Sequence, residues 1–466
     1  MALLKTEGFC INSIYASSVN EIRQQVRIEN KTPCLTPGQQ LMLYETAFEC
    51  MTSYWTSVVN HEEGVDSSDG IKVGIEAITS INNCIIGYEI PSSIYIEGVV
   101  QIVVQILNSN VIELINPAIL LVGNSFYREK VNSMQTEFLN LDIFNLLLHL
   151  CKKWGHKIYP CMMIALTNII VHSKSFNQQI VQLFPSNILA AVIASTAQSK
   201  TYVHDCSSFV KSLCIQKVDP EQASYLFQIL LSVKNYTGNW IFESLGYCVR
   251  CFYKCLDASS SLSQIINGTL FEEANQILMS SENFEELKAV IIFIGHSKTT
   301  INEKVIQLLN HADDYVSNLA LWLISRFMDE NGSAAVKICI DYNLLMIIQQ
   351  TFQNGSYRRR IECGFCLCSI LKYCSHSDIA NPILISFIPD LCELLSSCQN
   401  RLLTYKIISI LTHLLTLEGN PQILEQIQIS FEEYDILSVI SDYEEGDDYV
   451  MARLSNAFYK KYDRLI

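Results

Sequence analysis

Amide and aromatic side chains recur along this sequence at a nearly constant spacing. Asn124 and Asn168 are 44 residues apart, and the aromatic residues Trp322 and Phe365 are 43 apart. An asparagine on an apolar helix must find hydrogen-bond partners, and its amide can bond to the main chain of an extended peptide. A nearby ring can pack against the cation of a lysine or arginine from that peptide. This spacing therefore predicts a binding surface for an extended peptide segment.

Residues four apart on a helix share one face, so each recurring position is read together with the residue one turn before it. The alternative is structural, with Asn168 bonded to the next repeat and Trp322 filling core, and for one isolated pair it is the more common case. The predicted pairs are Leu120/Asn124, Ile164/Asn168, Ser208/Ser212, Tyr247/Cys251, Lys288/Ile292, Trp322/Arg326, Phe365/Ser369 and Ser409/His413.

No catalytic motif is present in the sequence. It has no glycine-rich phosphate loop, no HExxH and no GxSxG. These motifs are typical of phosphate-binding proteins, zinc-dependent proteases and serine hydrolases, respectively. The histidines are scattered singly. We therefore expect no enzyme, and a cysteine hydrolase built on Cys248 or Cys363 is the weakest of the hypotheses.

Two clusters among the eighteen cysteines raise the question of a metal. They are Cys248, Cys251 and Cys255, and Cys363, Cys366 and Cys368. Both lie inside apolar helical runs and lack the paired knuckles of a zinc site. Structural, reduced thiols are the expectation, with no metal and no cofactor.

Composition narrows the class of protein. The chain has 466 residues, is 49% apolar and 17% charged, and carries a formal net charge of −15. Its apolar runs, such as GVVQIVVQIL, are too short to span a bilayer, so membrane insertion is not expected. The negative charge disfavours nucleic acid and suits a basic protein partner, although it can also serve solubility alone. We expect a soluble intracellular protein.

The spacing also predicts the fold. A helical unit repeating every ~40–47 residues is typical of armadillo and HEAT solenoids, whose repeats bury their apolar faces against their neighbours. We expect an all-α, right-handed superhelical armadillo/HEAT-type solenoid of about nine to ten repeats, over residues 37–466. Residues 1–36 are expected to form a weakly ordered arm.

Several segments resemble the importin-alpha family of nuclear import adaptors. IALTNI (164–169) is similar to the family's repeated Trp-Ala-Leu-Ser/Thr-Asn-Ile motif, and Lys288 stands where the sixth repeat of the family has a basic residue. The segment 75–107 resembles the first repeat, and YDILSVISDYEEGDDYVMARLSNAFYKKY resembles the closing one. The resemblance covers most of the chain from about Tyr54 onward.

The resemblance implies partners and sites. It implies basic cargo proteins as partners, importin-beta at the N-terminal arm, and the export receptor at the closing repeat. It also implies a location in the cytoplasm and nucleus. The major site for basic nuclear localisation signals falls on Leu120, Asn124, Ile164, Asn168, Ser208 and Ser212. The minor site involves Lys288, Trp322, Arg326, Phe365 and Ser369.

The sequence also departs from the family. The three tryptophans of the major site are absent, and His172 stands where the family has an acidic residue. At the minor site, Arg326 would repel a lysine. These departures favour an alternative, an armadillo scaffold for protein interactions that no longer recognises basic signals.

Overall fold

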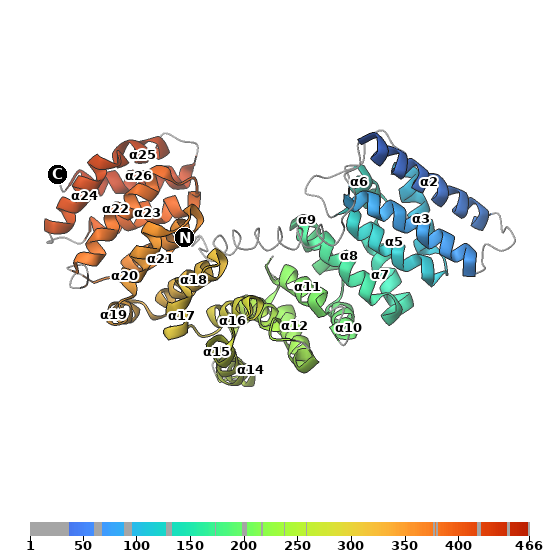
Figure 1. Cartoon of the computed structure of the whole chain (residues 1–466), viewed down its shortest axis with the longest axis horizontal. Helices are drawn as coiled ribbons and strands as arrows, with labels where there is room; N and C mark the ends of the chain where they lie inside the picture. The colour runs from blue at the N-terminus through green and yellow to red at the C-terminus, as the bar shows by residue number, and fades with distance from the viewer. Residues whose placement is uncertain are drawn as a thin grey trace. The chain divides into compact units, whose positions relative to one another are not determined.

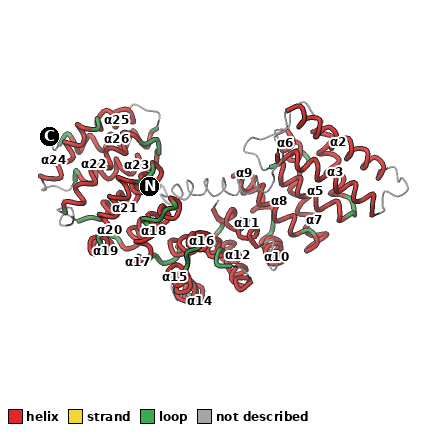
Figure 2. Tube along the Cα trace, viewed as in Figure 1, coloured by secondary structure: helices red, strands yellow, loops and turns green. Residues whose placement is uncertain are grey.

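The computed structural model contains helices and loops, with no strand among the residues it describes (Figure 2). The described residues are 37–59, 68–87, 96–126, 133–172, 174–197, 203–215, 218–236, 238–257, 259–375, 378, 381–416, 421–444 and 448–464. The predicted arm of residues 1–36 lies outside them. None of the described helices combines the length and the apolar character that crossing a bilayer requires.

The structure divides into two compact units, with the boundary between Gln264 and Ile265. We call residues 37–264 the N-terminal unit and residues 265–464 the C-terminal unit, and describe each by itself. The single solenoid domain expected over residues 37–466 stays a prediction.

The N-terminal unit is a series of stacked helices (Figure 1). They are α2 (Pro37–Val59), α3 (Ser68–Gly87), α4 (Ile96–Asn108), α5 (Ile112–Ser125), α6 (Ser133–Asn140), α7 (Ile143–Trp154), α8 (Tyr159–His172), α9 (Lys174–Leu183), α10 (Ser186–Ala197), α11 (Val203–Ile215), α12 (Pro220–Val233), α13 (Ile241–Phe252) and most of α14 (Ser261–Ile265). Short 3₁₀ turns follow α7, α12 and α13, at Gly155–Lys157, Lys234–Tyr236 and Tyr253–Cys255.

The C-terminal unit continues the same pattern. After a π-helical turn, Ile266–Leu270, come α15 (Phe271–Ser280), α16 (Phe284–His296), α17 (Glu303–Leu308), α18 (Asp314–Asn331), α19 (Ser333–Asp341), α20 (Leu344–Asn354), α21 (Tyr357–Tyr373), α22 (Pro382–Ser397), α23 (Arg401–Leu414), α24 (Pro421–Glu433), α25 (Ile436–Glu444) and α26 (Tyr449–Tyr462). The sequence interval between Ile292 and Arg326 is short because only the six-residue helix α17 separates α16 from α18.

In each unit, one helix per repeat packs against its counterpart in the next repeat. We call these the ladder helices: α3, α5, α8, α11 and α13 in the N-terminal unit, and α16, α18, α21, α23 and α26 in the C-terminal unit. Other helices cover them, as α9 and α10 cover α8. This repetition confirms the predicted all-α solenoid of armadillo type.

Burial patterns explain the two kinds of helix. α7 buries one stripe that includes Ile143, Leu147 and Cys151, as expected of an amphipathic helix with one covered face. The ladder helix α16 is buried at every residue from Leu287 to His296. A helix with neighbours on all sides must be apolar around its whole circumference. This is why the chain is so rich in apolar residues.

Helix boundaries follow local chemistry. Asp313 caps α18 by accepting a hydrogen bond from the Tyr315 amide at 2.7 Å, and Asn283 and Asn400 cap α16 and α23 in the same way. Gly332 alone joins α18 to α19, with a φ of +56° that suits glycine. Such short connections hold consecutive helices in fixed register.

Candidate functional site

Three asparagines form a hydrogen-bonded row across consecutive ladder helices of the N-terminal unit. Asn124 on α5 donates from Nδ2 to Oδ1 of Asn82 on α3 at 2.8 Å. Asn168 on α8 donates from Nδ2 to Oδ1 of Asn124 at 2.7 Å. All three side chains are half-buried, so one side of the row faces solvent. The two predicted asparagines therefore meet, and they are joined by a third.

Sequence reasoning missed Asn82, although a signal was present. Asn82 precedes Asn124 by 42 residues, close to the step of 44 between Asn124 and Asn168. A search for asparagines at that step, extended back to α3, would have found it.

A close approach between α5 and α8 positions this row. Gly123 lies directly against Ala165, so that a Cβ atom added at Gly123 would sit 2.4 Å from the Cα of Ala165. Only a glycine permits the two backbones to come this near. The adjacent residue, Asn124, is thereby brought within hydrogen-bond distance of Asn168.

The other predicted positions of the N-terminal unit do not take part in the asparagine row. Leu120, Ile164 and Ser208 are half-buried one turn before their partners, while Ser212 is buried. Ser212 donates its hydroxyl to the carbonyl of Ser208 within α11 at 2.7 Å, so it does not extend the amide row. The side chain of His172 lies outside the described part of the chain.

Trp322 in the C-terminal unit packs on the preceding ladder helix. A Cβ added at Gly295 would lie 2.4 Å from the indole, and the ring of His296 meets the indole edge-on with centroids 5.2 Å apart. Trp322 is only 5% exposed. Arg326, one turn later, donates from Nε to the Gly295 carbonyl at 3.1 Å. These two predicted residues therefore hold α18 against the end of α16.

The chain's own lysines stand over the other rings of the ladder helices. Lys406 on α23 has its ammonium 5.4 Å from the centroid of Phe365 on α21. Lys288 on α16 lies 6.0 Å from the ring of Tyr315 on α18. In the N-terminal unit, Lys211 lies 5.8 Å from the ring of Tyr247. These cation–π contacts each link two neighbouring repeats.

Two of these lysines also have carboxylate partners. Lys288 is buried and bonds to Glu285 at 3.2 Å, and Lys211 bonds to Glu243 at 2.5 Å, where both side chains are buried. Among the predicted positions, Phe365 and Ser369 on α21 are also buried, at 5% and 2% exposure. Arg326 on α18 and Lys406 on α23 are half-buried, so solvent can reach them.

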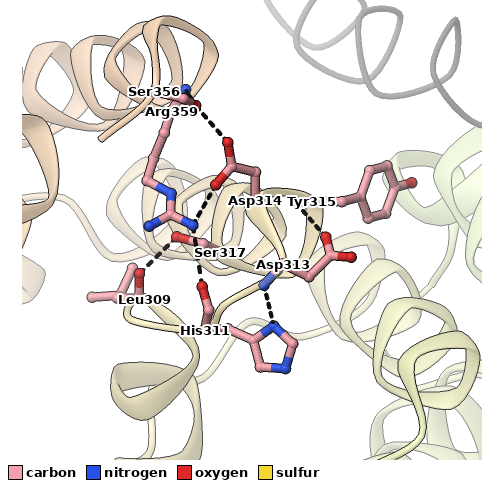
Figure 3. Close-up of polar contacts among 8 residues, drawn as sticks. All are labelled: Leu309, His311, Asp313, Asp314, Tyr315, Ser317, Ser356 and Arg359. Atoms are coloured by element: carbon pink, nitrogen blue, oxygen red, sulfur yellow. Dashed lines mark hydrogen bonds and ion pairs between the residues drawn. The ribbon is translucent and has the colours of Figure 1, made fainter. Parts of the chain in front are cut away.

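A polar cluster fixes the start of α18 against the start of α21 (Figure 3). The Arg359 guanidinium bonds to Oδ1 of Asp314 at 2.5 Å and to the His311 carbonyl at 3.1 Å. Ser356, the cap of α21, donates its hydroxyl to the other oxygen of Asp314 at 2.5 Å. The cluster sets the register of the two helices that carry Trp322 and Phe365.

The two cysteines considered as nucleophiles, Cys248 and Cys363, lie in the core. Both are fully buried, and burial raises the pKa of the Cys363 thiol. Burial also raises the pKa of Cys368 to about 12. A buried thiol that stays protonated is a poor nucleophile. In the regions that the structure covers, no three His, Cys, Asp or Glu side chains lie where they could hold a metal ion together.

Comparisons by sequence yield no relative. No protein-family model matches the chain, and no curated protein matches its sequence.

Solved structures do resemble the chain. The crystal structure of an engineered protein is 13% identical, with a TM-score of 0.55 over 90% of this chain and 99% of the other, which shows a shared fold. A structure from work on a phosphorylation switch between cadherin and beta-catenin is 10% identical, with a TM-score of 0.44 over 92% and 99%. A designed armadillo repeat protein bound to the peptide (KR)4 is 12% identical, with a TM-score of 0.30 over 58% and 98%. The last two scores are too low to support an argument about this chain.

Proposed function

We propose that this chain is a protein-interaction scaffold whose ladder helices hold an extended segment of a partner protein. The observation that carries the proposal is the half-exposed row of Asn82, Asn124 and Asn168. A primary amide has two N–H donors and two acceptor lone pairs. The two bonds within the row leave hydrogen-bonding capacity on each asparagine, and a peptide main chain offers matching groups at regular intervals.

In its specific form, the proposal follows the resemblance to the import adaptors. The partner is then a cargo protein with a basic nuclear localisation signal, bound at Asn124 and Asn168. The chain would move between cytoplasm and nucleus with importin-beta and the export receptor as further partners. The fold and the asparagine row support this role.

One observation favours the second candidate, a scaffold that does not recognise basic signals. The rings of Phe365, Tyr315 and Tyr247 each already carry a lysine of the chain itself. A lysine from a basic signal would have to displace that ammonium or approach it, and like charges repel.

Fluorescence anisotropy with a labelled basic signal peptide tests the first candidate on the full chain. Binding by the wild type that weakens about fivefold in Asn124→Ala would support it, since one amide hydrogen bond contributes ~1 kcal/mol. The control is Asn108→Ala, because Asn108 is exposed and its side-chain amide donates to the Val104 carbonyl of its own helix. Absence of binding by the wild type at micromolar peptide would remove the role of signal receptor.

A further inference from the structure

We propose that the C-terminal unit binds an acidic extended segment, at a surface formed by Lys406 on α23 and Arg453 on α26. This inference rests on the proposed function and specifies the charge of the partner at these helices. It reverses the expectation of a basic partner that the net charge of −15 suggests.

Lys406 is the central cation of this surface. Its ammonium lies over the Phe365 ring, and its side chain is half-buried. Among the described residues, no carboxylate lies within salt-bridge distance of it. A cation held by a ring keeps its full charge, so Lys406 can still attract a carboxylate from a partner.

Other cations of the unit contrast with Lys406, because carboxylates of the chain already neutralise them. Lys304 bonds to Glu282 at 2.7 Å, Arg360 to Glu393 at 2.5 Å and Arg359 to Asp314 at 2.5 Å. Lys406 differs from these three cations because its ammonium lies over a ring and has no carboxylate partner among the described residues.

Arg453 stands at the same level on the next ladder helix. The ion pair of Arg401 with Asp448, at 2.5 Å, fixes the starts of α23 and α26 beside each other. Lys406 follows Arg401 by five residues, and Arg453 follows Asp448 by five. Arg453 is exposed. Both cations therefore lie in the second turn of neighbouring ladder helices, so the carboxylates of an extended segment that crosses the two helices can meet them in succession.

The ring beneath Lys406 adds to selectivity against basic segments. Phe365 is one of the rings at which the resemblance places a lysine of a basic segment, and Lys406 occupies its face. An acidic segment has no need of the ring and gains from the ammonium. A protein segment fits better than a nucleic acid, because nucleic acid requires many phosphate contacts and the chain as a whole is strongly negative.

The test compares three labelled peptides of equal length, one acidic, one neutral and one basic, by anisotropy on the full chain at low and at physiological ionic strength. The acidic peptide should bind most tightly and should weaken as salt rises. In Lys406→Glu its affinity should fall at least about tenfold, since the charge-assisted bond becomes a repulsion. Arg453→Glu should act in the same direction.

Lys337→Glu is the matched control, because Lys337 is exposed on α19, outside the ladder helices, and the substitution makes the same change of charge. Circular dichroism of each variant shows whether it has folded. Lys406→Gln removes the charge with less risk to folding, and it should weaken the acidic peptide to a smaller extent.

The outcomes separate this inference from the proposed function. Tighter binding of the basic peptide, unaffected by Lys406→Glu but lost in Asn124→Ala, would overturn the inference and leave the proposed function standing. Equal or tighter binding of a single-stranded RNA of the same charge would also overturn it. Failure of all three peptides to bind would remove both.

Discussion

Asn124 occupies the middle of the asparagine row, and its role differs from that of its two neighbours. It donates to Asn82 and accepts from Asn168, whereas each of those takes part in one bond of the row. The half-buried amide is therefore both a link between three repeats and a candidate contact for a partner. Its contribution to stability can be measured apart from binding.

We predict that Asn124→Ala lowers the free energy of unfolding by about 1–2 kcal/mol, because two hydrogen bonds are lost and two half-buried groups are left unpaired. Urea unfolding of Asn124→Ala, Asn168→Ala and the double variant gives the coupling between the two amides, expected at ~0.5–1.5 kcal/mol. Asn108→Ala should change stability by less than about 0.5 kcal/mol. A coupling of zero would mean that the row does not form.

Asp390 on α22 is a carboxyl with a raised pKa. Burial and the nearby carboxylate of Glu393 raise the pKa of Asp390 to about 6, against the opposing effect of Arg360. Near pH 7 the carboxyl is ionised in both the folded and the unfolded protein. Because its pKa is raised only in the folded state, keeping it ionised there lowers the free energy of unfolding. Between about pH 7 and pH 5 the folded state takes up a proton that the unfolded state does not, so this group's contribution to stability rises as the pH falls.

We predict that Asp390→Asn raises the free energy of unfolding near pH 7 by about 1 kcal/mol, a value reduced from the full shift because the side chain is half-exposed. The gain over the wild type should shrink near pH 5, where Asp390 itself becomes neutral. Urea unfolding at the two pH values measures both differences. A gain of equal size at both pH values would show that protonation is not its cause.

At the scale of helices, the ladder depends on how closely neighbouring elements approach. At Gly123 in the N-terminal unit, an added Cβ would meet backbone as well as side-chain atoms of Ala165. Flexible side chains can move aside, whereas a helix backbone moves only as a whole. The position of α8 relative to α5, and with it the asparagine row, therefore depends on one missing methyl group.

We predict that Gly123→Ala destabilises the protein by about 1–3 kcal/mol, because overpacking exceeds the ~1 kcal/mol that alanine gains over glycine inside a helix. Thermal and urea unfolding measure the change. The control is Gly38→Ala in the first turn of α2, where no atom lies within 4 Å of the added Cβ. That variant should be neutral or slightly more stable. Equal effects of the two substitutions would rule out the close approach as the cause.

The sequence specified helices and repeats better than it specified contacts. The step of about 43 residues predicted the solenoid because burial of an apolar face in every repeat imposes a period on the chain. It also placed Asn124 and Asn168 together. It did not reveal that Gly295 lets the Trp322 indole pack against α16, or that Lys406 lies over Phe365. Such contacts depend on how closely two helices from neighbouring repeats approach and how each is rotated about its axis. A repeat period contains no information about either.

At the scale of the whole molecule, net charge and local charge point in opposite directions. The formal charge of −15 predicts attraction to basic proteins in general. Within the C-terminal unit, by contrast, several cations, among them Lys304, Arg359 and Arg360, are paired with carboxylates, whereas Lys406 is held by a ring. A global count cannot distinguish a neutralised cation from one that keeps its charge, and that distinction decides which partner a surface attracts.

The division into two compact units leads to a prediction about unfolding. In a solenoid each repeat is stabilised by its neighbours, so a local defect spreads along the stack until the contacts become sparse. We predict that Gly123→Ala in the full chain speeds amide hydrogen exchange throughout α3 to α13 and leaves α16 to α26 unchanged. Exchange followed by mass spectrometry measures this at the level of single helices.

The reciprocal variant lies in the C-terminal unit. Leu391 on α22 is fully buried, and Leu391→Ala should lower stability there by ~2–5 kcal/mol. It should speed exchange in α16 to α26 and leave α3 to α13 protected. If either variant speeds exchange along the entire chain, the molecule unfolds as one cooperative body, and a partner bound at the asparagine row would then stabilise the Lys406 surface as well. If the effects stay separate, each unit binds its segment independently.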